Sequence, residues 1–145
     1  MTIVSSETLH VSCVAIDGRA ILIEGRSGAG KSDLALRLID RGAQLVSDDY
    51  TLLKRSRTQL LAAPPVTIAG KIEVRGLGIV TMPYVDQIPV ALVIDLAETV
   101  ERMPAERQTR RIAGIDIAVV AIDGHDASAP IKVELALKRL GLPPS

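Results

Sequence analysis

A glycine-rich segment near the start of the chain constrains its fold more than any other feature. Residues 25–32 are Gly-Arg-Ser-Gly-Ala-Gly-Lys-Ser, which matches the pattern G-x-x-x-x-G-K-[ST]. A strand is expected before this segment at Arg19–Glu24, and a helix after it, because Lys31–Arg41 places apolar residues at near-helical spacing. The strand, loop and helix together predict an α/β fold in which helices flank a mixed sheet.

The residue types in this segment suit the enclosure of phosphate groups. Glycines let successive backbone N–H groups turn toward phosphate oxygens, and the following helix adds the positive end of its dipole. Lys31 would reach the β- and γ-phosphates of a nucleotide, and the Ser32 hydroxyl would bind Mg²⁺. The candidate nucleotide contacts are therefore Gly25, Arg26, Ser27, Gly28, Ala29, Gly30, Lys31 and Ser32.

Turn and strand signals extend this unit into a larger sheet. Asp17-Gly18 between apolar runs predicts a β-hairpin. Ser128 can cap a final helix that stops at Gly141. The further strands and this helix are expected at His10–Ile16, Gln44–Ser47, Pro89–Leu96, Ile115–Ile122 and Ala129–Leu140. A length of 145 residues suits a single domain over residues 1–145.

Phosphoryl transfer also needs carboxylates, which hold the metal and accept a proton from the nucleophile. Three places offer them at the ends of apolar runs: the adjacent pair Asp48-Asp49, then Asp95, then Asp123. The pattern alone does not choose among these three. The pair differs from the others because neighbouring side chains on an extended chain point to opposite sides. One of its carboxylates could therefore face the metal and the other the nucleophile.

Composition excludes several other kinds of protein. With 17 basic and 17 acidic residues the formal net charge is zero, so no global positive field favours nucleic acid or an anionic membrane. The only aromatic residues are Tyr50 and Tyr84, too few for base-stacking platforms. Cys13 is the single cysteine, which permits no internal disulfide, and the start of the chain lacks a signal-peptide pattern. We therefore expect a cytoplasmic protein that binds neither nucleic acid nor membrane.

Four stretches of the chain resemble the C-terminal catalytic domain of HPr kinase/phosphorylase in order and spacing. They are Glu24–Leu36, Arg41–Asp49, Ala63–Pro65 and Glu73–Ile79. Many enzymes share the glycine-rich pattern, whereas the Asp-Asp pair at this distance and the Glu-x-Arg-Gly-Leu-Gly-Ile stretch resemble this family's own signature. The resemblance is good over about residues 8–96. It implies a PEP-carboxykinase-like catalytic domain in a short, alphaproteobacterial-type form.

The resemblance implies a bacterial serine kinase that uses ATP and Mg²⁺ to phosphorylate HPr, the small phosphocarrier protein of the sugar phosphotransferase system. The Asp48-Asp49 pair would supply the base that deprotonates the serine, with the choice between the two left open. His10 falls where the family carries an active-site histidine, and Arg75 would contact phosphate. The implied catalytic residues are Lys31, Asp48, Asp49, His10 and Arg75, and the implied metal ligands are Ser32, Asp49 and Glu73. Longer family members imply a homo-oligomer, specifically a hexamer.

Departures from the family pattern bear on the reverse reaction, dephosphorylation of HPr, which many members catalyse. The N-terminal domain, the Pro-x-Gly-Arg-Asn stretch with its catalytic arginine and the C-terminal dephosphorylation region have no counterpart in this sequence. Arg110 or Arg111 could replace that arginine only if the fold brings them to the site. Phosphorylation of HPr is thus the reaction expected here, and dephosphorylation is the reaction that these departures affect. The residues alone also allow a small-molecule kinase with Glu101–Arg111 as its lid, or a nucleotide-dependent binding switch.

Overall fold

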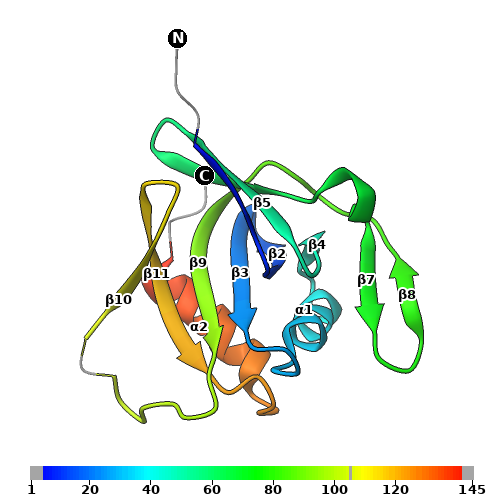
Figure 1. Ribbon diagram of the computed structural model, residues 1–145. Coiled ribbons are helices and arrows are strands. Elements are labelled where there is room, and N and C mark those ends of the chain that lie inside the picture. The colour runs from blue at the N-terminus through cyan, green and yellow to red at the C-terminus, as the bar shows by residue number, and fades with distance from the viewer. Residues whose placement is uncertain (1–4, 105, 142–145) are drawn as a thin grey trace.

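The strand, loop and helix expected around residues 25–32 form as predicted. In the computed structural model, which describes residues 5–104 and 106–141, β3 (Arg19–Gly25) leads into the loop and α1 (Lys31–Asp40) follows it (Figure 1). α1 buries Leu34, Ala35 and Leu38 on one face. This is the apolar face that the helical spacing predicts.

The hairpin predicted at Asp17-Gly18 also forms. β2 (Ser12–Ile16) pairs antiparallel with β3 across this turn. Asp17 has a φ of 51° and Gly18 a φ of 73°. A two-residue hairpin turn with positive φ at both positions matches the twist of its strands, which is why Asp-Gly is favoured there.

Most other elements are strands. Those in the described residues are β1 (Ser6–Leu9), β4 (Gln44–Ser47), β5 (Thr51–Ser56), β6 (Gln59–Ala63), β7 (Lys71–Val74), β8 (Gly78–Thr81), β9 (Ile88–Leu96), β10 (Gln108–Ile112) and β11 (Ile115–Ile122). A short 3₁₀ helix, η1 (Val66–Ile68), precedes β7, and α2 (Ala129–Leu140) ends the described chain. The strands and the final helix expected from the sequence are confirmed. Ser128 stands at the start of α2 but makes no side-chain capping hydrogen bond.

Nine strands of the described chain form one curled, mixed sheet in the order β1-β5-β6-β9-β3-β2-β4, from which β11 and β10 branch at β9. One edge of β9 pairs in parallel with β3. Its other edge is shared, because Ile88 and Pro89 pair with β6 while residues 93–96 pair with β11. This branching lets β1, β5 and β6 fold across the central strands (Figure 1).

The strand directions bring several carboxyl ends to one edge of the sheet. β4 runs parallel to β3 because both pair antiparallel with β2, and β9 and β11 also run parallel to β3. The loop after Gly25, the acidic pair after Ser47, and the turns after Leu96 and Ile122 therefore meet at this edge. Open α/β sheets bind ligands at the edge where parallel strands end.

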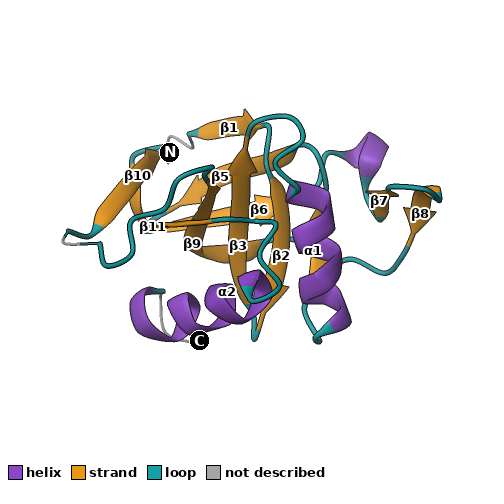
Figure 2. Cartoon of the chain, turned by 90° about the horizontal axis from the view of Figure 1, so that it is seen from below, coloured by secondary structure: helices purple, strands orange, loops and turns teal. Residues whose placement is uncertain are grey.

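Both faces of the central strands are covered. Ile21 and Ile23 face a core that includes residues of α1 and α2, which lie on one side of the sheet (Figure 2). The alternate residue Leu22 faces a second core, which is closed by Leu53 of β5 and Ile112 of β10. Burial on both faces explains why these strands are continuous apolar runs rather than alternating ones.

Two segments form strands that no sequence pattern above predicts. Between the last two apolar runs lies β10, which pairs antiparallel with β11 and buries Ile112. Residues 108–111 of β10 are exposed, so its sequence lacks the alternation that marks a strand. β7 and β8 form a separate hairpin that leaves Leu77 and Ile79 exposed. None of the helices in the described residues is long and apolar enough to cross a membrane.

The buried cysteine, Cys13, gives a test of how tightly the second core is packed. Cys13 lies on β2 with none of its surface exposed, and burial raises the pKa of its thiol well above the ordinary value. At about pH 8 the thiol therefore stays protonated in the folded protein and does not react as a nucleophile. We expect a disulfide reagent such as DTNB to label the native protein very slowly and the denatured protein at once. Rapid labelling of the native protein would contradict this packing.

Candidate active site

The segment 25–32, called the P-loop from this point, has the conformation of an open cradle. Gly28 and Gly30 have φ of 84° and 94°, which residues with a side chain rarely adopt. Lys31 folds over the loop, because its Nζ donates hydrogen bonds to the carbonyl oxygens of Gly25 at 2.8 Å and Arg26 at 3.3 Å. The ammonium group and the first turn of α1 thus face the same space, as binding of a polyphosphate requires.

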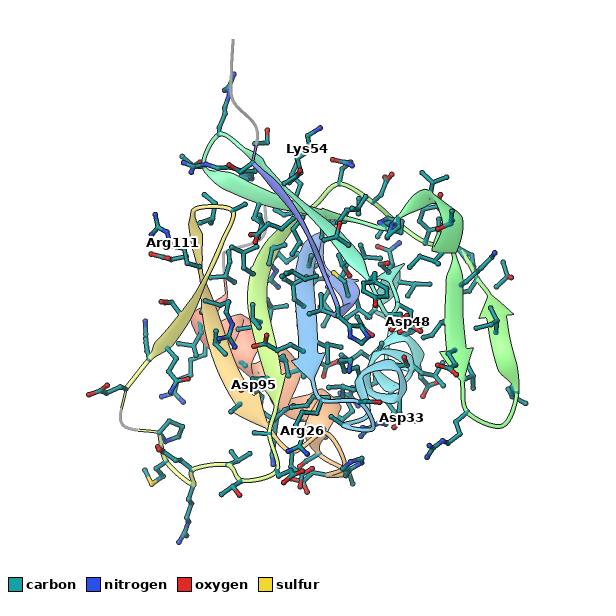
Figure 3. All side chains as sticks on the ribbon, in the orientation of Figure 1. Arg26, Asp33, Asp48, Lys54, Asp95 and Arg111 are labelled. Atoms are coloured by element: carbon teal, nitrogen blue, oxygen red, sulfur yellow. The ribbon has the colours of Figure 1, made fainter. Side chains whose placement is uncertain are left out.

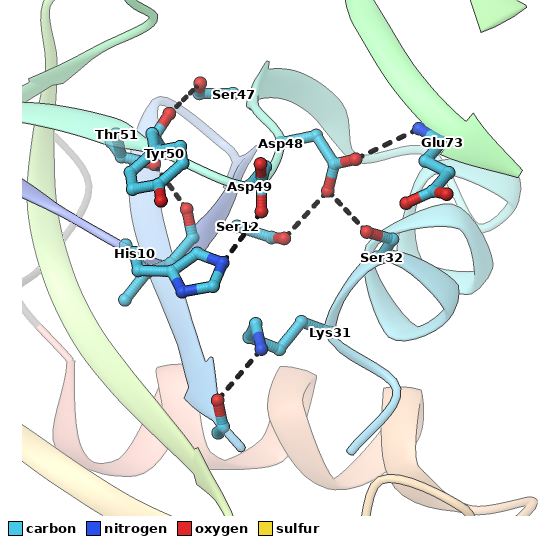
Figure 4. Close-up of polar contacts among 12 residues, drawn as sticks. His10, Ser12, Lys31, Ser32, Ser47, Asp48, Asp49, Tyr50, Thr51 and Glu73 are labelled. Carbon is cyan, nitrogen blue, oxygen red and sulfur yellow. Dashed lines mark hydrogen bonds and ion pairs between the residues drawn. The ribbon is translucent and has the colours of Figure 1, made fainter. Parts of the chain in front are cut away.

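The Asp48 carboxylate is the centre of the polar network beside this loop (Figure 4). Its Oδ1 accepts hydrogen bonds from Ser12 Oγ at 2.8 Å and Ser32 Oγ at 2.7 Å, and its Oδ2 accepts one from the backbone N–H of Glu73 at 3.0 Å. Asp48 is only 5% exposed. Three donors thus converge on one buried carboxylate. It therefore fixes the rotamer of Ser32.

Asp49 makes different contacts from its neighbour. Its side chain is 63% exposed, and His10 Nε2 lies 2.7 Å from its Oδ1. Because an ionised carboxylate only accepts, this contact places the imidazole proton on Nε2. Tyr50 stacks on the His10 ring with a centroid separation of 4.8 Å. The histidine is thus held between a carboxylate and an aromatic ring.

The two aspartates diverge, but not for the reason that the sequence suggests. The pattern assumes an extended chain, whereas Asp49 has a φ of 71°. Two further hydrogen bonds brace this turn: Ser47 Oγ donates to the carbonyl of Tyr50, and Thr51 Oγ1 donates to the carbonyl of Val11 at 2.8 Å. Divergence therefore depends on a left-handed residue held by its neighbours.

The structure brings together most of the predicted site residues, but not all. Ser32, Asp48, Asp49 and His10 gather beside Lys31 (Figure 4), and Glu73 joins them through its backbone N–H. Arg75 lies exposed in the turn between β7 and β8, and no hydrogen bond or ion pair links it to this group within residues 5–104 and 106–141.

The structure also distinguishes among the three carboxylate positions that the pattern leaves open. Asp48 is the one that reaches Ser32. Asp95 and Asp123 instead line a cleft on the other side of the P-loop.

Sequence reasoning missed Ser12, Ser47, Tyr50 and Thr51 as parts of the site. Ser12 is fully buried on β2 and points its hydroxyl at Asp48. A polar residue at the start of a buried strand needs a hydrogen-bond partner, and this was the signal available. Tyr50 adjoins the acidic pair in the sequence, but its ring contact with His10 depends on the turn at Asp49.

The donor set fits Mg²⁺ better than a metal that needs a full protein cage. Ser32 and Asp48 offer oxygen ligands beside the cradle, and Mg²⁺ is commonly bound by one or two protein oxygens together with phosphates and water. In the part of the chain that the structure describes, no group of three or more His, Cys, Asp or Glu side chains could hold a metal alone. The P-loop likewise fits phosphate, since Lys31 and the N-terminal end of α1 stand beside glycines whose backbone can turn N–H groups toward an anion.

Comparison with known proteins places this chain in a family. A family model described as the HPr Serine kinase C-terminal domain matches residues 2–136. The chain belongs to the HPr serine kinase C-terminal domain family. The resemblance that the motifs imply is therefore confirmed.

Individual relatives agree with this assignment. An HPr kinase/phosphorylase of Clostridium tetani is 47% identical over 75 residues, which cover 52% of this chain and 25% of the relative. One of Prosthecochloris aestuarii is 32% identical over 129 residues, which cover 80% of this chain and 38% of the relative. The chain thus spans well under half the length of these curated relatives.

The fold has a solved counterpart. The structure of the Hpr(Ser) kinase/phosphatase from Coxiella burnetii matches with a TM-score of 0.81 and 33% sequence identity, over 92% of this chain and 89% of that chain. The α/β fold with a mixed sheet and flanking helices, expected from the sequence, is thus confirmed.

The hydrogen bonds of Asp48 predict unequal effects of two matched substitutions. Asp48→Asn places an amide N–H₂ against one of the three donors, so one buried hydrogen bond becomes a donor–donor contact. We expect the free energy of unfolding to fall by about 1–3 kcal/mol. Asp49→Asn, on the exposed neighbour, should change it by less than about 0.5 kcal/mol. Urea unfolding followed by circular dichroism compares the two, and equal losses would contradict a central role for Asp48.

Proposed function

We propose that this chain is the catalytic domain of an ATP-dependent kinase that phosphorylates a serine of HPr. The observation that carries the proposal is the hydrogen bond from Ser32 of the P-loop to buried Asp48, next to the exposed Asp49–His10 pair. One carboxylate is thus committed to the P-loop and the other is open to an incoming protein. Family membership and the names of the relatives support HPr as that protein.

The P-loop residues would bind and orient the phosphates of ATP. Backbone N–H groups of the P-loop would donate to the phosphate oxygens, and α1 would direct its positive end at them. Lys31 now donates to the loop's own carbonyls, and by rotating its side chain it can donate to the β- and γ-phosphates instead. Most of the catalysis then comes from positioning and charge neutralisation, as phosphoryl transfer requires.

The two aspartates divide the remaining tasks. Both oxygens of Asp48 already accept hydrogen bonds, so we assign it to holding Ser32 and the metal rather than to proton transfer. Asp49 has an exposed carboxylate, and we assign it as the base that takes the proton of the serine hydroxyl. His10 orients Asp49 by donating its Nε2–H to it.

The metal ligands in this scheme are Ser32 and Asp48, with Glu73 as a further carboxylate. The resemblance alone points to Asp49 in place of Asp48, and the contact between Ser32 and Asp48 favours the change. Mg²⁺, when bound, neutralises charge on the phosphates. Arg75, on the turn after β7, would contact phosphate or the HPr backbone only after that hairpin and the substrate come together. A homo-oligomer, a hexamer by analogy with longer family members, and a cytoplasmic location complete the proposal.

Loss of the P-loop cation tests the proposal as a whole. Lys31→Ala removes the charge that neutralises the β- and γ-phosphates, so transfer of labelled phosphate from ATP to HPr should fall by at least about 10³-fold. Lys138→Ala, an exposed lysine in the last turn of α2, serves as the matched control and should keep full activity. Near-normal transfer by the Lys31 variant would refute the assignment of this site.

The division of tasks predicts a specific kinetic signature for Asp49. Asp49→Asn keeps the size of the side chain but removes the proton acceptor, so kcat should fall about 10²–10⁴-fold while the affinity for ATP stays near that of the unmodified protein. Asp116→Asn, an exposed carboxylate at the amino end of β11, is the control. Steady-state kinetics with HPr as substrate, together with calorimetric ATP binding, give both quantities. An unchanged kcat would show that Asp49 is not the base.

A further inference from the structure

The P-loop has a second side that the proposed reaction does not use. Ser32, Asp48 and Asp49 lie toward β2 and β4, whereas Asp95 lies on β9, across β3 from them (Figure 3). On this β9 side there is a cleft of about 720 Å³. Its walls are the first residues of the P-loop and two segments called wall A (residues 95–98) and wall B (residues 123–125). This volume is in the range of small-molecule sites in proteins.

The position of the carboxylates fixes the direction in which a nucleotide must lie, given the proposed function on which this inference rests. Asp49 can take a proton only from a hydroxyl that attacks on its own side of the P-loop. The terminal phosphate must therefore point toward Asp48 and Asp49. The rest of the nucleotide leaves the P-loop in the opposite direction, toward β9, and there it meets the cleft.

We propose that this cleft binds the nucleoside of ATP and that His125 of wall B contacts it. The His125 ring packs against the P-loop: its Cε1 lies 3.6 Å from the position that a Cβ on Gly30 would take. The residue is otherwise exposed and lines the cleft. Leu96 and Ala97 of wall A add apolar surface, on which a base can rest. An imidazole ring beside an apolar wall is suited to stacking with a base.

The cleft is preformed, because its walls are packed tightly against the P-loop. A Cβ on Gly124 would lie 3.0 Å from the carbonyl oxygen of Ala29, and one on Gly25 would lie 3.0 Å from the Cβ of Leu96. Arg37 of α1 donates hydrogen bonds to the carbonyl oxygens of Gly124 and Asp126. The helix that follows the P-loop therefore also holds wall B in place.

The polar groups of the cleft suit a nucleoside rather than more phosphate. Glu24 and Asp95 are register partners on β3 and β9, and both line the cleft. Glu24 also pairs with Arg110. Carboxylates accept hydrogen bonds from ribose hydroxyls and from the amino group of a base, but they repel phosphate. Arg26 and Arg110 also line the cleft, but each pairs with a glutamate, Glu98 and Glu24 respectively. The cleft should therefore add more affinity for ATP than for a bare polyphosphate.

Two probes separate this subsite from the P-loop itself: ATP and inorganic tripolyphosphate, each with Mg²⁺, titrated by calorimetry. His125→Ala should weaken ATP binding about tenfold and leave tripolyphosphate binding within about twofold. Ala97→Leu, which narrows the cleft from wall A, should act in the same way. Ser128→Ala is the control and should bind both probes normally, because Ser128 follows wall B outside the cleft and its side chain makes no capping hydrogen bond. Lys31→Ala should weaken both probes.

The calorimetric results distinguish the nucleoside subsite from the assignment of the P-loop. The nucleoside subsite would be overturned if the His125 and Ala97 variants bound ATP as tightly as the unmodified protein does. The assignment of the P-loop would then still stand. Equal weakening of ATP and tripolyphosphate by His125→Ala would also overturn it, because His125 would then contact phosphate. Failure of the unmodified protein to bind either probe would overturn the proposed function as well.

A measurement on the unmodified protein guards against misfolded variants. The sequence has two histidines, His10 and His125, so the ring protons give few and resolvable NMR signals. The His125 signals should shift further on addition of ATP than on addition of tripolyphosphate. Shifts of equal size with both probes would contradict the proposal.

Discussion

The hydrogen bonds of one buried carboxylate hold the site together. Asp48 joins β2 through Ser12, α1 through Ser32 and β7 through the backbone of Glu73. Burying a charge is costly unless donors replace the lost water, and here three donors do so. The same contacts connect the P-loop helix to elements that are distant in the sequence. The carboxylate that we propose as a metal ligand is thereby also a structural link between three parts of the fold.

The neighbouring aspartate differs because of a single backbone angle. The left-handed conformation of Asp49 turns its side chain out of the network and toward His10. Aspartate tolerates this conformation better than most residues, so the turn itself favours an acidic residue there. Tyr50 then covers the ring of His10. Two identical side chains in sequence thus acquire a buried and an exposed environment, and the proposed separation of metal binding from proton transfer follows from that difference.

The sequence predicted the elements whose signals are local. The Asp-Gly turn, and the strand, loop and helix around residues 25–32, depend on neighbours within one segment, and the structure contains each of them. What was missed depends on contacts between distant segments: Ser12 beneath Asp48, β10 alongside β11, and the cleft where His125 meets the P-loop. No local pattern encodes the closeness of residues that lie far apart in the chain.

The pairing of β3 with β9 affects the order in which the protein folds during synthesis. The strand that carries the P-loop has as its parallel partner a strand about seventy residues later, and β11 joins that partner later still. Contacts of such long sequence separation form slowly, since a large loop must close before they contribute. During synthesis, a nascent chain that already contains the whole glycine-rich motif still lacks β9, the strand that pairs with one edge of β3. The strand that carries the P-loop is therefore flanked on both of its edges only late in synthesis, once β9 has emerged from the ribosome and docked.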